Sequence, residues 1–347
     1  MENLEIILPE IFLSLTIMFL LLFGVFKNNS SKLIYNLTTL SLIILFALLL
    51  NLYQVSDLSI FNNSYKVDSL STFMKLLTIG SGIFVMLTSS KYIEIYNINK
   101  MEYPILILSS VLGMMVMISS NDLIVFYMGL ELQSLALYVL ASFNRENLLS
   151  TESGLKYFVL SALSSGLLLY GCSLIYGFSG STNFNIILDN SSSGQYGITF
   201  GIVFILVGLA FKISAVPFHI RFLYVPFAEM NDQWQMIIIF LSIASMIFGA
   251  VAAIGQKNLK RLIAYSSIGH MGYALTGLAA GTNQGIQGSI SYIAIYLVMN
   301  LAFFSCMFML RRNNEYYESI EDLSGLSKNH PLLSFSLLII LFLSLIH

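Results

Sequence analysis

Long apolar runs separated by short polar stretches cover almost the whole of this chain. Eleven of them approach the ~20 residues that a helix needs to cross the hydrocarbon core of a bilayer. Because an isolated strand leaves its backbone hydrogen bonds unsatisfied in lipid, we expect every run to be a helix. The predicted spans are 5–26, 34–53, 70–90, 104–120, 122–143, 157–177, 199–220, 234–255, 262–282, 286–310 and a partial one, 331–346.

Only two longer polar stretches interrupt the runs. Gly180–Tyr196 is rich in Ser and Asn, and Arg311–His330 is rich in charge. The 347 residues are 57% hydrophobic and only 10% charged, whereas a soluble protein carries about 25% charged residues. We therefore predict an all-α polytopic membrane protein with about 10–11 spans and no soluble domain.

Lysine and arginine alternate between the predicted loops. The loops after spans two, four and six carry only Lys66, whereas those after spans one, three and five carry Lys27, Lys32, Lys91, Lys100 and Arg145. Positive charge accumulates on the inner side of a membrane. This pattern places the N-terminus outside and the odd-numbered loops in the cytoplasm or matrix.

The alternation fails after span seven. The loop Gln256–Arg261 and the loop Arg311–His330 both carry positive charges, yet counting spans places both outside. One explanation is that the rule is statistical. The other is that one helix is missing between His219 and Trp234, because the intervening segment is too short and too polar to span.

Glu131 lies near the middle of span 122–143. Tyr127, Glu131, Ser134 and Tyr138 follow i, i+4, i+7, i+11 spacing, so they share one helix face. An acid within a span faces protein or water and is commonly functional. We predict a proton-handling role, and the alternative is a structural acid paired across helices.

Span 157–177 follows Lys156, whose side chain either takes part in proton transfer or reaches to the membrane surface. The same span contains Ser161, Ser164 and Ser165. Small hydroxyl residues of this kind suit close helix packing in membranes.

Span 199–220 contains Lys212, Pro217 and His219. Pro217 cannot donate a hydrogen bond to the carbonyl of Ile213, so we expect a broken helix there. Broken helices at membrane depth line cavities or are buried in protein, and a buried lysine exchanges protons more readily. His219 is a second proton-transfer candidate or a packed core residue.

Span 262–282 contains Ser266, His270 and Tyr273 on one helix face. Histidine titrates near physiological pH and can pass protons. Helix packing is the alternative role for His270.

Other site chemistries have no support in the sequence. Cys172 and Cys306 lie in apolar runs without a CxxC pattern or a neighbouring histidine, which argues against zinc, iron–sulfur and disulfide sites. No basic stripe indicates nucleic acid, and no strand-associated glycine loop indicates a phosphate site. The N-terminus opens with Glu2 and Glu5 and does not resemble a secretory signal.

Four stretches of the sequence are distinctive when taken together. They are EYPILILSSVLGMMVMISSNDLIVFYMGLELQSLALYVL (Glu102–Leu140), GLKYFVLSALSSGLLLYG (Gly154–Gly171), FKISAVPFHI (Phe211–Ile220) and QKNLKRLIAYSSIGHMGYALTGL (Gln256–Leu278). They resemble the N-type antiporter-like membrane subunit of respiratory complex I, the proton-pumping NADH:quinone oxidoreductase. GLELQSL within the first stretch favours the N-type subunit over its two larger paralogues.

The resemblance implies an antiporter-like fold with inverted helix repeats, each holding a broken helix. It implies a single membrane domain, 1–347, in which N-terminal helices (5–120) overlap a first repeat (104–220), followed by an incomplete second repeat (234–347). Glu131 and Lys212 would form the glutamate–lysine pair, with Lys156 a further base. NADH, flavin, iron–sulfur clusters and quinone would belong to partner subunits, leaving this chain without a cofactor or metal of its own.

The implied partners are other complex I membrane subunits, including antiporter-like paralogues, in a bacterial or mitochondrial inner membrane.

The sequence departs from the family pattern at two places. About thirty residues that the family carries after FKISAVPFHI, including a central lysine helix, have no counterpart here, and the distal lysine helix expected beyond LSLIH has none either. A sodium/proton antiporter subunit of the multisubunit type and a truncated, non-pumping remnant therefore remain alternatives.

The charge pattern makes one topological prediction. If a helix is truly absent after Ile220, reagents confined to the outer side should reach the loop Gln256–Arg261 in intact membranes. Labelling from the inner side alone would show that the local topology rearranges to restore the alternation.

Overall fold

The computed structural model describes residues 4–27, 30–52, 58–96, 98–190, 196–212, 231–312, 315–317 and 319–346. They fall into two compact units. The first ends at Phe211, and the second contains Lys212 and the described residues from 231 onward.

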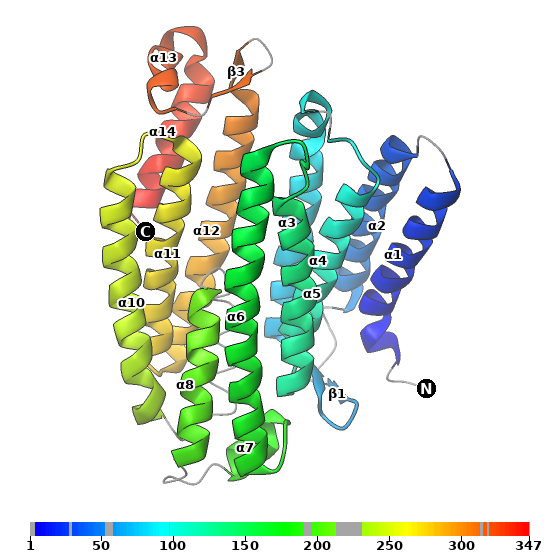
Figure 1. The fold of residues 1–347 in the computed structure, drawn as a ribbon, viewed down its shortest axis with the longest axis vertical. Coiled ribbons are helices and arrows are strands. Elements are labelled where there is room, and N and C mark those ends of the chain that lie inside the picture. Colours follow the sequence, from blue (N-terminus) through cyan, green and yellow to red (C-terminus); the bar gives the residue numbers. More distant parts are fainter. Residues whose placement is uncertain are drawn as a thin grey trace. The chain divides into compact units, whose positions relative to one another are not determined.

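The first unit is a bundle of antiparallel neighbouring helices (Figure 1). α1 to α4 surround a shared apolar core that includes Leu13, Leu42 and Leu108. α5 packs against α4 and α6, and α8 packs along α6. The helices are α1 (Leu8–Phe26), α2 (Ser31–Leu52), α3 (Ser69–Ile95), α4 (Glu102–Ser119), α5 (Leu123–Ala141), α6 (Leu148–Ser179), α7 (Phe184–Asn190) and α8 (Tyr196–Phe211), preceded by the 3-10 turn η1 (Leu4–Ile7).

Polar capping residues set where several of these helices begin. Asp68 and Ser71 form a reciprocal capping box at α3, with both hydrogen bonds at 2.8 Å. Asn147 caps α6, which ends at Gly180 with a φ of 76°. Such caps satisfy the backbone groups that the first and last turns leave without partners, and they end the apolar spans where the sequence turns polar.

A small hairpin joins α2 to α3. Its strands, β1 (Leu58–Ile60) and β2 (Tyr65–Val67), pair antiparallel. Its turn holds Phe61, Asn62 and Asn63 at φ of 52°, 53° and 64°. Side-chain-bearing residues rarely adopt this left-handed conformation and keep it only where their surroundings enforce it, so the turn must be held by neighbouring contacts.

α4 and α5 cross at two glycines. A Cβ added at Gly129 would lie 2.8 Å from the backbone nitrogen of Met117, and one added at Gly113 would lie 2.5 Å from that of Gln133. Both distances are too short for any side chain. Glycine here lets the two backbones touch, which is how membrane helices gain packing energy without a hydrophobic driving force.

The second unit contains three long helices and a short C-terminal pair. α10 packs along α11, α11 along α12, and α12 along α14, with Leu259, Phe303 and Met307 in the core. The elements are α10 (Asn231–Ile254), α11 (Leu259–Ala279), α12 (Asn283–Met309), the two-residue strands β3 (Arg311–Arg312) and β4 (Glu315–Tyr316), the 3-10 turn η4 (Glu321–Leu323), α13 (Leu326–Asn329) and α14 (Pro331–Ile346).

The all-α membrane prediction is confirmed for the described residues. Eight helices there are long and apolar enough to cross a membrane, and α8 and α14 are shorter apolar helices. One predicted boundary is wrong: span 199–220 should have contained Lys212, yet α8 ends at Phe211 and Lys212 is a turn residue. The remaining part of this predicted span, residues 213–220, lies outside the described residues. The predicted break itself, at Pro217, and the division into repeats lie outside or across the described residues and stay predictions.

The glycine crossing yields a stability prediction. Gly129→Ala should lower the thermal midpoint of the purified complex, because overpacking at a tight contact costs about 1–3 kcal/mol. Gly166→Ala is the matched control, since a Cβ on this α6 glycine meets open space and alanine favours a helix. Equal midpoints for the two variants would show that the crossing is not tight.

Candidate functional site

Glu131 lies on α5 and is half-buried against α6. The hydroxyl of Ser165, itself buried on α6, donates a hydrogen bond to Glu131 Oε1. The carboxylate oxygen that accepts this bond can also accept a proton. The sequence assigned Ser165 to helix packing only, so its role at the acid was missed.

The polar stripe on α5 faces protein, as its spacing predicted. Ser134 and Tyr138 are buried, and the Tyr138 hydroxyl donates to Ser161 on α6. A separate face of α5 is apolar and exposed, as expected for a surface in contact with lipid: Ile124, Met128, Leu132, Leu135 and Val139. α5 therefore has a polar face toward α6, a glycine face against α4 and an exposed apolar face.

Further contacts join α5 and α6 toward their loop. Ser150 donates to the carbonyl of Ala141 at 2.8 Å. Together with the bonds at Glu131 and Tyr138, this contact makes a series of α5–α6 links at three levels. We call these three contacts the α5–α6 ladder.

The start of α5 is fixed by hydrogen bonds between loops. Asp122 Oδ1 accepts from the backbone of Ile124 and Val125, and its Oδ2 accepts from the Thr182 hydroxyl at 2.6 Å. The backbone N–H of Leu123 donates to the Thr182 carbonyl at 2.9 Å. Asp122 therefore caps its own helix and ties it to the end of α6.

The hairpin turn joins the same loops. Asn121 donates through its side chain to the carbonyl of Asn63 and through its backbone to that of Ser64, both at 2.8 Å. Asn183 also donates to Asn63, at 3.1 Å. These contacts explain the left-handed turn. They also bring together the three loops that the charge pattern places outside, and Figure 1 shows the hairpin and α7 at the same end of this unit.

Of the other predicted residues, Lys156 belongs to the same unit as Glu131 and makes a different contact. Lys156 is exposed and pairs with Glu152 one turn earlier on α6, Nζ to Oε1 at 2.5 Å. This placement fits the membrane-surface alternative. Lys212 is the turn residue after α8 and belongs to the second unit. His219 and Pro217 lie outside the described residues.

His270 is buried in the second unit and joins three helices. Its Nδ1 lies 2.6 Å from the Tyr292 hydroxyl on α12, and its Nε2 lies 3.0 Å from the Ser344 hydroxyl on α14. The Tyr296 ring lies beside it, with centroids 4.8 Å apart. With hydroxyls on both nitrogens, the imidazole can hold or pass a proton, and it also ties α11 to its neighbours.

A buried acid–base pair in the first unit was not predicted from the sequence. Lys75 on α3 lies 2.6 Å from Glu10 on α1, Nζ to Oε1, and the two side chains are only 2% and 6% exposed. Lys75 also donates to the Tyr65 hydroxyl of the hairpin at 2.8 Å. The signal was present in the sequence, because each of the spans 5–26 and 70–90 contains one internal charge of opposite sign.

The buried pair connects α1, α3 and the hairpin. Isolated burial of either charge would be costly, so each depends on the other. The Glu10–Lys75 contact is an ion pair by distance, and Glu10 Oε2 has no hydrogen-bond partner in the described part of the chain. Among the same residues, no three His, Cys, Asp or Glu side chains gather as metal ligands.

The chain's class follows from the comparison with known proteins. Residues 120–225 and 220–346 match the family "NADH:quinone oxidoreductase/Mrp antiporter, TM". In solved structures, the fold resembles a chain of respiratory complex I from Thermus thermophilus with bound aureothin, at a TM-score of 0.76 and 26% identity over 97% of this chain and 78% of that one. It also resembles a chain of the Mrp complex from Dietzia sp. DQ12-45-1b, at a TM-score of 0.82 and 18% identity, covering 97% and 70%. The molecule is an antiporter-like membrane protein.

Curated relatives narrow the class. NADH-quinone oxidoreductase subunit N of Pelagibacter ubique is 67% identical, covering 99% of this chain and 79% of the relative. The same subunit of Parvibaculum lavamentivorans is 44% identical, covering 96% and 76%. The chain belongs to the subunit N family of NADH-quinone oxidoreductases, and its bacterial relatives favour the bacterial inner membrane over the mitochondrial one.

The alignments also bear on the missing helix. The Pelagibacter ubique alignment runs over 372 positions, whereas this chain has 347 residues, so at least 25 aligned positions face a gap in this chain. The two matched family regions meet at residues 220–225. This is where the resemblance lacked about thirty residues and where the charge alternation failed.

The buried pair yields a prediction that separates charge from packing. Lys75→Met alone should destabilise the complex by about 3–5 kcal/mol, because Glu10 then keeps an uncompensated buried charge. The double variant Glu10→Leu/Lys75→Met should recover most of that loss. Thermal melting of the purified complex measures both, and additive losses would show that the two charges do not depend on each other.

Proposed function

We propose that this chain relays protons across the membrane as a non-redox subunit of an NADH:quinone oxidoreductase. Family membership supports the assembly, and the redox cofactors and quinone are assigned to partner subunits. The observation that carries the proton role is Glu131, an acid in the middle of a membrane helix with a buried hydroxyl as its partner. A carboxylate is retained at such a position mainly where it is used.

In this proposal Glu131 is the proton-holding acid, and Ser165 is its hydrogen-bond donor. Lys212 is the paired base, whose approach or withdrawal changes the charge that Glu131 experiences. An opposite charge nearby favours the ionised carboxylate. Quinone reduction elsewhere in the complex would shift this balance through neighbouring subunits, so that the pair loads and releases a proton in turn.

The remaining candidate residues have secondary roles in the proposed proton path. His270 would pass protons in the second unit through its two hydroxyl partners. His219 stays a candidate from the sequence, since it lies outside the described residues. Lys156, exposed and paired with Glu152, would serve at the membrane surface.

The antiporter alternative has fold similarity alone in its favour, since the Mrp chain is 18% identical. The remnant alternative rests on a specific observation, the gap of at least 25 aligned positions. Both alternatives keep the α5–α6 arrangement. Neither alternative couples proton transfer at Glu131 to NADH oxidation, and in this both differ from the proposal.

The decisive variant is Glu131→Gln in the assembled complex. Positioned proton-transfer groups typically contribute about 10²-fold or more, so NADH-driven proton flux through this subunit should fall at least about tenfold. Ser165→Ala should give a smaller loss, because it removes one hydrogen bond to a charged group, worth about 1.5–3 kcal/mol. Fluorescent-dye quenching in inverted vesicles measures pumping.

Ser164→Ala is the matched control, because among the described residues this neighbouring buried hydroxyl donates to the backbone carbonyl of Ser161, at 2.8 Å, and not to Glu131. NADH oxidation with an artificial acceptor confirms assembly in each case. Full pumping by an assembled Glu131→Gln complex would contradict the proposal and favour the remnant.

A further inference from the structure

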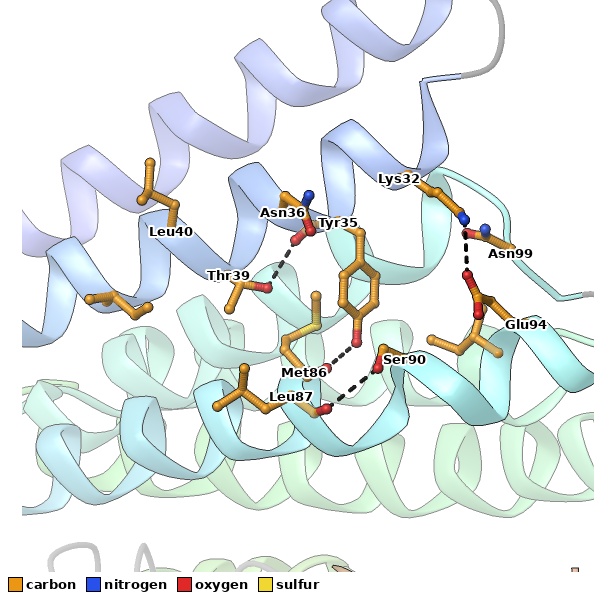
Figure 2. A pocket seen from close by; sticks show the side chains of 12 residues that line it. Lys32, Tyr35, Asn36, Thr39, Leu40, Met86, Leu87, Ser90, Glu94 and Asn99 are labelled. Carbon is orange, nitrogen blue, oxygen red and sulfur yellow. Dashed lines mark hydrogen bonds and ion pairs between the residues drawn. The ribbon is translucent and has the colours of Figure 1, made fainter. Parts of the chain in front are cut away.

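A cavity of about 520 Å³ opens between α2 and α3 in the first unit (Figure 2). It lies away from Glu131 and the α5–α6 ladder, and the proposed proton path does not use it. Its wall changes character along the helices. One end is polar and charged, and the rest is lined by aliphatic side chains.

The polar end contains an ion pair. Lys32 Nζ, at the start of α2, lies 3.1 Å from Glu94 Oε1, near the end of α3. Both side chains are more than half exposed, at 78% and 55%. An exposed pair of this kind contributes little to stability, so its two charges can separate to bind an external group at small cost. Asn36 and Asn99 add amides to the same rim, and an amide both donates and accepts.

The inner hydroxyls of the cavity are already engaged. Tyr35 donates to the carbonyl of Met86, and Thr39 donates to the carbonyl of Tyr35 at 2.9 Å. Figure 2 shows both bonds directed at the helices themselves. Below them, Leu40, Ile43 and Leu87 are about half exposed or more, so the lower part of the cavity offers apolar surface only.

The length of the cavity matches one leaflet. Lys32 and Ile43 are separated by about 16 Å along α2 at 1.5 Å per residue, which is about half of a ~30 Å hydrocarbon core. The charged end belongs to the loops after the first and third spans, which carry Lys27, Lys32, Lys91 and Lys100. Positive loops of this kind face the inner side, so the cavity lies in the inner leaflet.

We propose that this cavity is a binding site for one zwitterionic phospholipid of the inner leaflet, with an ethanolamine headgroup. The lipid phosphate binds Lys32, its primary ammonium binds Glu94, and an acyl chain lies along Leu40, Ile43 and Leu87. Adjacent charges of opposite sign match a headgroup that carries both. An anionic headgroup would satisfy Lys32 but would leave Glu94 facing negative charge.

The test is photocrosslinking with diazirine-tagged lipids on the purified, assembled complex, read out by mass spectrometry of α2 and α3 peptides. Wild type should crosslink phosphatidylethanolamine there, in preference to phosphatidylglycerol. Leu87→Trp should abolish the crosslink by filling the cavity, whereas Leu22→Trp, on an exposed α1 face outside it, should not. Glu94→Gln should weaken the ethanolamine preference up to about fivefold, the scale of an exposed ion pair.

Lys91→Gln is the charge control, since Lys91 is exposed on α3 outside the cavity. Equal crosslinking of both lipids in wild type would overturn the headgroup assignment. An unchanged signal in Leu87→Trp, or a neighbouring subunit's helix seated in the cavity, would overturn the site itself. Proton pumping is not a readout here, so failure of this proposal is distinct from failure of the role of Glu131.

Discussion

A polar side chain inside a hydrocarbon layer needs a hydrogen-bond partner within the protein, and this constraint shapes the first unit. Water cannot supply the missing bond there, so a side chain that reaches a neighbouring helix also fixes the distance between the two helices. Glu131 and Tyr138 reach serines on α6, and Glu10 reaches Lys75. Close approach at Gly113 and Gly129 then brings α4 against the other side of α5.

The same constraint explains the loops at the outer end. Loop backbone near a membrane surface needs internal partners, and the carbonyls of the left-handed turn at Asn62 and Asn63 receive the side chains of Asn121 and Asn183. An unfavourable local conformation is thereby held by the contacts it makes. The hairpin in turn carries Tyr65 to the buried Lys75, which links the loops to the helical core.

Much of this was predictable from the sequence, because long apolar runs allow only helices in lipid. The spacing of the α5 stripe correctly indicated a face turned toward protein. What spacing could not supply was the partner: nothing within α6 alone distinguishes Ser165, which bonds the acid, from Ser164, which bonds its own helix. The Glu10–Lys75 pair was missed for the same reason, since its two charges are 65 positions apart in the chain. The boundary at Lys212 was set too late because the apolar run continues past the point where the helix ends.

The charge alternation and the departure from the family both place a missing segment after Ile220. Positive charge in loops that the order of spans places outside has an ordinary explanation when taken alone. The same is true of the family residues that have no counterpart in this chain. The division of the family match falls at the same short region of the chain, and the length of the alignment requires a gap in this chain. Agreement between the charge pattern and the alignment is informative because the two are independent. The charge pattern reflects how the chain is inserted into the membrane, and the alignment reflects descent from a common ancestor.

The α5–α6 ladder has a consequence for how Glu131 can respond to its surroundings. Tyr138 and the Ala141 carbonyl on the loop side of the acid, and Asp122 at the start of α5, hold this helix to α6 and to the loop that follows α6. The bracing fixes the position of the Glu131 backbone relative to α6. It therefore leaves rotation of the side chain itself as the way in which the carboxylate can move.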